Sequence, residues 1–206
     1  MRFPHKKVLS VLSSVTTRWK SARFVGEAAS LLSERLRPGN ASCGNNVRAF
    51  FLDLLANLPS HLRLKGVRAD AGFCLPELLA LWKQKQLPYV VVAQLSQPIQ
   101  KIIKGGLVWR ATEVPGSEVA QMEYQAMSWP HPRRLILIRH QALVRGGKQL
   151  LDVPGYRFRA LVTSLPGLTH PPLAVWRHYN GRADCENVIK ELQAGFALPT
   201  LCLEKF

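Results

Sequence analysis

A short segment near the end of the chain, residues 179–193, places polar side chains at spacings that suit a helix. The segment contains no proline and follows Pro171 and Pro172, which favours an amphipathic helix beginning after them. At about 100° per residue, one stripe of that helix carries a carboxylate among cations and polar groups: Tyr179, Arg182, Glu186, Lys190 and Gln193. A carboxylate flanked by cations suits metal and phosphate chemistry. The alternative is a solvated face with an ordinary glutamate–lysine pair, which contributes about 0.2–0.5 kcal/mol.

A second carboxylate, Asp70, follows a predicted strand. Residues 61–68 alternate between polar and apolar side chains, which is typical of a strand with one buried face. Ligands of open α/β sheets bind at the carboxyl ends of strands, so a functional carboxylate is expected at this position. The alternative is that Asp70 caps the turn before Ala71 and Gly72, or the helix after it.

The two segments together resemble a known family. The pattern Tyr179-x2-Arg182-x3-Glu186-x6-Gln193 is similar to the Y-R-E-K signature of bacterial insertion-sequence transposases with a DDE catalytic domain. The string VRADAGF at residues 67–73 resembles the segment that carries the family's second acid. The string LRPGN at residues 36–40 resembles a segment before it. The three matches follow the family's order, and the resemblance extends over residues 31–206.

This resemblance implies an α/β fold, namely an RNase H-like mixed sheet with flanking helices, interrupted by a mostly β insertion. It also implies DNA transposition by metal-dependent phosphodiester cleavage and strand transfer, with Asp70 and Glu186 as the second and third catalytic acids. These carboxylates would bind Mg²⁺ or Mn²⁺, because hard cations prefer oxygen ligands. By the same resemblance, Arg182 would hold a DNA phosphate. Tyr179 would brace the DNA strand by stacking or by a hydrogen bond.

Two positions depart from the family's pattern. The family's lysine falls at Gln193, which removes a positive charge, and Lys190 is the candidate to stand in for it. The family's first acid lies upstream of LRPGN, but the chain has no aspartate before Asp53. The upstream carboxylates Glu27 and Glu34 fall on a predicted helix. We therefore expect the opening strand of the fold to be absent, the domain to be truncated at both ends and its activity to be impaired.

Composition and charge bound the class of protein. The chain has 206 residues, of which 47% are hydrophobic and 20% charged, and this indicates a globular domain with a real core. The net charge of +15 favours a polyanionic partner, with nucleic acid first. The alternatives are an anionic membrane surface, or a charge that merely keeps the protein soluble. The four cysteines have no zinc-binding spacing.

The expected partner is DNA at transposon ends, together with a second copy of the chain or a full-length transposase. No apolar run reaches the roughly 18 residues of a membrane span, so no membrane partner is expected. The expected location is the bacterial cytoplasm, in association with the nucleoid.

The rest of the chain must position these residues. Apolar spacing predicts helices at residues 7–19, 26–37, 47–58 and 76–86, and strands at 61–68, 89–93 and 156–163. Strand, helix, strand between residues 61 and 93 predicts that part of the sheet is parallel. Between residues 97 and 155, glycines and prolines separate short β-prone runs at 107–114, 119–127 and 133–144, which predicts a basic meander of hairpins. Such a meander would offer cations and aromatic rings to DNA, or would simply have a basic exposed face.

The predicted organisation has four parts: an unassigned segment 1–30, a first part of the catalytic core 31–96, a basic β-rich insertion 97–155 and a second core part 156–206. Two functions follow from it. One is an impaired DDE transposase, and the other is a non-catalytic nucleic-acid-binding remnant that occupies transposon DNA or interferes with a full-length enzyme. A third possibility, a basic structural protein unrelated to transposition, predicts that Asp70 and Glu186 lie far apart.

Overall fold

The computed structural model describes residues 7–15, 20–25, 31–37, 46–58, 63–141, 153 and 155–180. The chain divides into two compact units. The first consists of residues 1–68 with residues 180–206, and the second of residues 69–179. The predicted division of the chain at residues 30, 96 and 155 stays a prediction.

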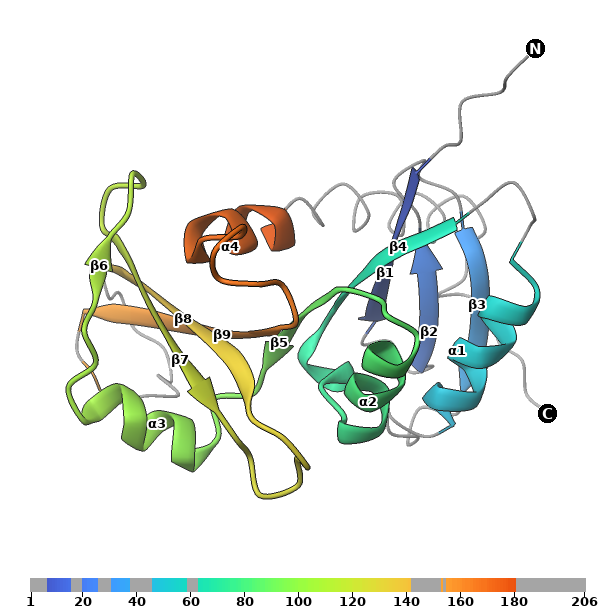
Figure 1. Ribbon diagram of the computed structural model, residues 1–206, viewed down its shortest axis with the longest axis horizontal. Helices are drawn as coiled ribbons and strands as arrows, with labels where there is room; N and C mark the ends of the chain where they lie inside the picture. The colour runs from blue at the N-terminus through green and yellow to red at the C-terminus, as the bar shows by residue number, and fades with distance from the viewer. Residues whose placement is uncertain are drawn as a thin grey trace, which may run out of the picture. The chain divides into compact units, whose positions relative to one another are not determined.

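The first unit contains an antiparallel meander of three strands (Figure 1). β1 pairs with β2 from Val11 opposite Val25 to Val15 opposite Ser21, and β2 pairs in turn with β3. A fourth strand borders β1 on its other side, which gives the order β3-β2-β1-β4. The strands are β1 (Lys7–Val15), β2 (Lys20–Val25), β3 (Leu31–Arg37) and β4 (Arg63–Ala69).

α1 (Val47–Ala56) lies beside β3 in this unit. It confirms the helix predicted at residues 47–58. Its buried residues are three or four positions apart or adjacent, and so form one stripe, as an amphipathic helix requires: Val47, Phe50, Phe51 and Leu54.

The early strands correct three expectations. The helices predicted at residues 7–19 and 26–37 are wrong, because β1 and β3 occupy their described parts. The opening strand that was expected to be absent is present, between β2 and β4. In the sequence of β1, KVLSVLSSV, the apolar residues recur at spacings that also fit a helix. Whether such a run forms a strand depends on the neighbours with which it pairs, and local spacing does not show these.

The second unit is built on a five-stranded antiparallel sheet in the order β5-β9-β8-β7-β6. The hairpin of β7 and β8 continues directly into the pairing of β8 with β9. The strands are β5 (Tyr89–Ala93), β6 (Arg110–Ala111), β7 (Ser117–Tyr124), β8 (Arg133–Gln141) and β9 (Tyr156–Thr163). The helices are the 3-10 helix η1 (Ala71–Phe73), α2 (Pro76–Gln84), α3 (Gln97–Lys104) and α4 (Pro172–Asn180).

Most predicted elements of this unit are confirmed. α2, β5 and β9 agree with the sequence, as does β4 of the first unit, and β7 and β8 form the predicted hairpin. The α/β class is therefore confirmed. The start of the predicted meander is wrong, because residues 97–104 form α3, and only two residues of the run 107–114 are a strand. Pro98 lies in the first turn of α3, where proline is tolerated, and Ile99 and Ile103 are buried on one side of the helix.

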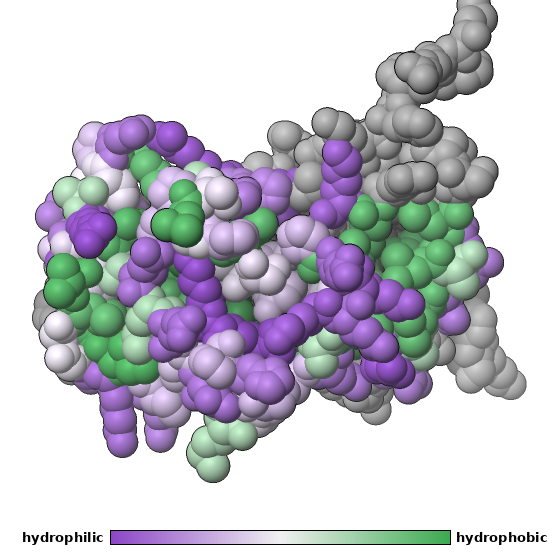
Figure 2. All heavy atoms as spheres, in the orientation of Figure 1, coloured by the Kyte–Doolittle hydropathy of each residue, from purple (hydrophilic) through white to green (hydrophobic). Residues whose placement is uncertain are grey.

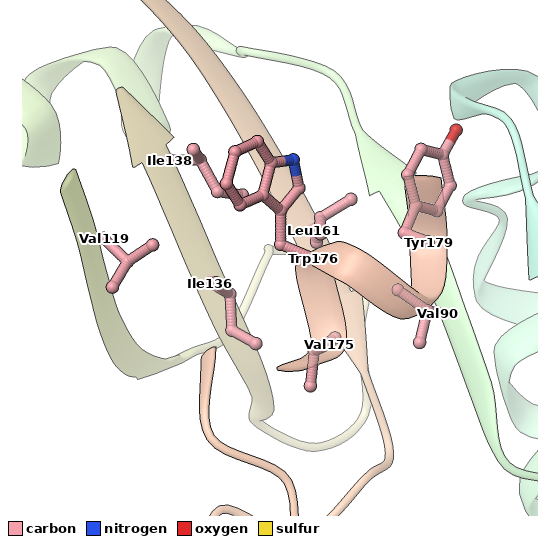
Figure 3. Close-up of a cluster of buried hydrophobic side chains, with 8 residues drawn as sticks. All are labelled: Val90, Val119, Ile136, Ile138, Leu161, Val175, Trp176 and Tyr179. Carbon is pink, nitrogen blue, oxygen red and sulfur yellow. The ribbon is translucent and has the colours of Figure 1, made fainter. Parts of the chain in front are cut away.

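α4 covers one face of this sheet with a compact apolar cluster (Figure 3). The helix contributes Val175, Trp176 and Tyr179. The strands contribute Val90, Val119, Ile136, Ile138 and Leu161. Burying each large aliphatic side chain stabilises the fold by about 1.5–3 kcal/mol. In Figure 1, α3 lies on the opposite side of the strands from α4.

The surface of the second unit is mixed in character. On the face drawn in Figure 2, hydrophilic residues cover most of it, and hydrophobic residues form separate patches among them. The described helices include none that is both long enough and apolar enough to cross a membrane.

Candidate catalytic site

Asp70 directly follows the carboxyl end of β4. The last four residues of this strand, 66–69, are all buried, whereas Asp70 is half-buried. The backbone carbonyl of Asp70 accepts a 3.0 Å hydrogen bond from the amide of Phe73, and this begins η1. Within this described turn the Asp70 side chain makes no capping hydrogen bond, and α2 begins after Leu75 instead. Helix capping therefore does not account for the carboxylate.

The turn after Asp70 is held in place by its neighbours. The side chain of Phe73 is fully buried, and the amide of Cys74 donates a 3.2 Å hydrogen bond to the carbonyl of Ala71. η1 also lies beside β5. α2 follows at once and is anchored by the buried side chains of Leu78 and Trp82. A carboxylate on a turn fixed in this way has a defined position, which binding a metal ion requires.

Tyr179 is the one residue of the predicted helical stripe that the structure describes. Its side chain is 4% exposed and belongs to the cluster under α4. The guanidinium of Arg159 lies over its ring, 5.8 Å from the ring centroid. A ring placed like this has little exposed surface, and its hydroxyl points away from Val90 (Figure 3).

The remaining predicted site residues, Arg182, Glu186, Lys190 and Gln193, lie outside the described residues. The meeting of Asp70 with Glu186 therefore stays a prediction. Within the described part of the chain, no three His, Cys, Asp or Glu side chains lie close enough together to hold a metal ion.

The sequence of β1 is relevant to the family's first catalytic acid, for which the chain has no upstream aspartate. By the stated resemblance, that acid belongs to the first strand of the sheet, and the chain does have this strand in a central position. Its sequence, KVLSVLSSV, contains no aspartate or glutamate. β1 therefore supplies no carboxylate, and the absence of the family's first acid stays a prediction.

A buried polar cluster near the Asp70 turn was not found from the sequence. Arg133, the first residue of β8, is 8% exposed, and its Nη1 donates a 2.5 Å hydrogen bond to the hydroxyl of Tyr89. The guanidinium lies 6.0 Å from the ring centroid of Tyr89 and 5.7 Å from that of Trp129. Its positive charge also acts on the thiol of Cys74. The sequence predicts a basic meander here, but only the fold reveals that Arg133 is buried.

The protonation of this cluster follows from its burial. Burial raises the pKa of the Cys74 thiol to about 11, against the opposing effect of Arg133. Burial likewise raises the pKa of Tyr89, again opposed by Arg133. Both groups keep their protons at neutral pH. Cys74 is therefore a poor nucleophile.

A second group of charged and aromatic side chains surrounds Arg139 of β8. The guanidinium of Arg139 is 4.5 Å from the ring centroid of Trp109 and 4.6 Å from that of Tyr156. Its Nε donates a 2.7 Å hydrogen bond to the carboxylate of Glu118. The basic and aromatic residues predicted for this segment are therefore present on one sheet, although this arginine is already paired.

Comparison with known proteins places the chain in a family. Residues 22–206 match the family described as transposase DDE domain group 1. Because the match spans most of the chain, the protein belongs to this family of DDE transposase domains. A search of curated proteins returned no match.

Membership of this family supports several of the expectations drawn from the sequence. The predicted α/β, RNase H-like fold class is confirmed by the family together with the mixed α/β elements. The family connects the chain with DNA transposition and with DNA as a partner. The matched residues begin within β2, so β1 precedes them.

Proposed function

We propose that the chain is a catalytic domain derived from a transposase, which binds transposon DNA and cleaves and joins its phosphodiesters at an impaired rate. The observation that carries this proposal is the position of Asp70. It is a half-buried carboxylate, not used for capping, on a fixed turn at the end of β4. Family membership supplies the reaction class, and Glu186 would supply the third acid.

The donor chemistry of these residues fits a hard divalent cation. Asp70 and Glu186 offer carboxylate oxygens, the ligands that Mg²⁺ and Mn²⁺ prefer. The thiol of Cys74 retains its proton at neutral pH, which leaves the Asp70 carboxylate as the metal donor at this turn. When bound, the metal would stabilise charge on the attacking and leaving oxygens of the phosphodiester.

The protein's own residues would bind and orient the DNA strand. Arg182 would hold a phosphate through paired N–H donors, which match the geometry of phosphate oxygens. The Tyr179 hydroxyl would donate a hydrogen bond to the same strand, since its ring is buried. Lys190 would replace part of the charge lost at Gln193.

The expected impairment of catalysis rests on β1, because this strand carries no carboxylate. Two carboxylates bind a metal more weakly than three, so we expect slow cleavage that needs a high metal concentration. The missing carboxylate also supports the second candidate, a non-catalytic remnant that occupies transposon ends or joins a full-length transposase. A second copy of the chain and the bacterial cytoplasm, beside the nucleoid, are the partner and the location that this function requires.

A nicking assay tests the catalytic function. Supercoiled plasmid carrying the transposon ends would be incubated with the full chain in Mg²⁺ or Mn²⁺. Asp70→Asn and Glu186→Gln should each reduce the rate by more than about tenfold, as expected for loss of a group that binds the metal. Glu77→Gln is the matched control, because Glu77 is an exposed carboxylate on α2. Equal rates for the wild type and Glu186→Gln, or no nicking at all, would remove the catalytic function.

Restoring a carboxylate on β1 tests the impairment. Ser10→Asp, Ser13→Asp and Ser14→Asp each place one on the central strand, and we expect one of them to increase nicking. If none does and the wild type is inactive, the remnant function is favoured. That function predicts that coexpression of the chain lowers excision by a full-length transposase, including when the chain carries Glu186→Gln.

A further inference from the structure

Two exposed arginines of β9, Arg157 and Arg159, form a basic row on the surface of the second unit. They are two residues apart in a part of the strand where exposed and half-buried side chains alternate, so both project from the same face of the sheet. Arg159 is opposite Ile138, which belongs to the apolar cluster under α4. Arg157 is opposite His140, whose ring packs on Trp176 of that helix. The row therefore lies on the face of the sheet that carries α4.

Arg159 connects this row with the predicted DNA-binding residues. Its guanidinium lies over the ring of Tyr179, 5.8 Å from the ring centroid, and Tyr179 is the first residue of the predicted helical stripe. The N–H groups of a guanidinium lie in its plane, so stacking on a ring uses its face and leaves its edge able to donate to a phosphate. The contact thus holds an exposed cation beside the end of α4, where the predicted stripe begins.

Arg157 adds a second cation to the row. Within the described part of the chain, no hydrogen bond or ion pair of this side chain is found. Residues two positions apart in a strand are separated by about 6.4–6.8 Å. The phosphates of one DNA strand follow one another at about 3.4 Å along the helix axis. Two guanidiniums at this separation can therefore contact phosphates of the same DNA strand.

We propose that Arg159 and Arg157 bind the phosphate backbone of one DNA strand and extend its path from Tyr179 along β9. The row matches this backbone in charge, and the family makes DNA the expected partner. The inference rests on the proposed function for the identity of that partner. It adds two residues that position the strand away from the metal, so they act on DNA binding and not on the cleavage step.

Duplex binding at several salt concentrations tests the row. Fluorescence anisotropy on the full chain would use one labelled duplex of random sequence and one that carries the transposon ends. Arg157→Gln and Arg159→Gln should each reduce the slope of log affinity against log salt by about 0.9, and the double variant by about 1.8. Arg157→Lys and Arg159→Lys keep the charge and should keep the slope. Arg48→Gln is the matched control, because Arg48 is an exposed arginine on α1 and its loss changes the net charge equally.

Folding of each variant would be checked by thermal melting. Arg157→Gln keeps the test valid if Arg159→Gln is unstable through loss of its contact with Tyr179. An unchanged slope in both glutamine variants would overturn the proposal. An equal reduction of the slope in Arg48→Gln would do the same, because the net charge and not the row would then determine the salt dependence.

Two further comparisons separate the row from catalysis and from another polyanionic surface. Duplex binding that depends on the row, without any nicking, upholds the row and removes the catalytic function. Nicking that depends on Asp70, with equal duplex binding by all arginine variants, upholds catalysis and overturns the row. Vesicles that contain an anionic phospholipid supply the other surface. If the double variant loses vesicle binding but keeps duplex binding, the row binds membranes and its assignment to DNA is overturned.

Discussion

The imidazole of His140 lies between a hydroxyl and an aromatic ring in the second unit. Its Nδ1 is 2.6 Å from the Oγ of the buried Ser117, and its ring centroid is 4.8 Å from that of Trp176. Burial lowers the pKa of His140, and the positive charge of Arg159 lowers it further. Arg157 is directly opposite His140 in the pairing of β8 with β9. These surroundings favour the neutral ring, which can accept the hydrogen bond from Ser117.

This environment predicts a pH dependence of stability. The folded state binds a proton at His140 less readily than the unfolded state, whose pKa is near 6.5. The stabilisation is therefore fully present above that pKa and is lost as the pH falls below it. We expect the urea midpoint of the wild type to fall between pH 7.5 and 5.5, and His140→Gln to lose part of that fall. His131→Gln, at an exposed histidine in the loop before β8, should keep it. The same pH dependence in all three proteins would contradict this account.

Among single residues, Asp70 could be identified as a candidate site residue from the sequence, whereas Arg133 could not. Asp70 was found because it follows a strand and belongs to a recognisable string. Arg133 was not found, since its signal is burial without a carboxylate, which depends on Tyr89 and Cys74 being brought to it by the fold.

At the scale of elements, α4 is held to its sheet mainly by apolar contacts. Trp176 is 8% exposed and packs on His140 and the cluster under the helix, whereas the next residue, Arg177, makes an ion pair with Glu113. The side chains of that ion pair are 57% and 74% exposed, so solvent screens their attraction.

These two neighbouring residues give a matched pair of variants. Trp176→Ala should lower the free energy of unfolding by about 3–5 kcal/mol, because it empties a large buried volume. Arg177→Ala should change it by less than about 1 kcal/mol. Chemical denaturation of both variants measures the difference. Comparable losses would show that α4 depends on its surface charge instead.

The elements that the sequence predicted correctly are those with a strong local signal. α1 has one apolar stripe, and β5 is a continuous apolar run, so each indicates its own structure. β1 and β3 were predicted as helices because their apolar spacing fits both structures, and strand pairing, which the spacing does not reveal, decides between them. α3 was missed because it is short and lies in a segment rich in turn residues.

For the whole molecule, the net charge of +15 favours electrostatic binding to DNA, the partner that the family implies. Cations that contact phosphates release counterions from DNA, and this makes the affinity depend steeply on salt.

We expect affinity for a duplex to fall by about 10–10³-fold between 50 and 200 mM salt, with little dependence on sequence away from the transposon ends. Arg157→Gln, at an exposed arginine on β9, should reduce the slope of log affinity against log salt by about 0.9 if it contacts one phosphate. Fluorescence anisotropy at several salt concentrations measures both quantities. An affinity independent of salt would contradict electrostatic binding.

The buried thiol of Cys74 has a practical consequence for following motion in this molecule. With its pKa near 11, the thiol reacts slowly with alkylating reagents while the turn after Asp70 is closed. Alkylation at this position, followed by peptide mapping, would therefore report how often the turn opens. The chain thus contains its own probe of local unfolding, next to the carboxylate on which its chemistry is proposed to depend.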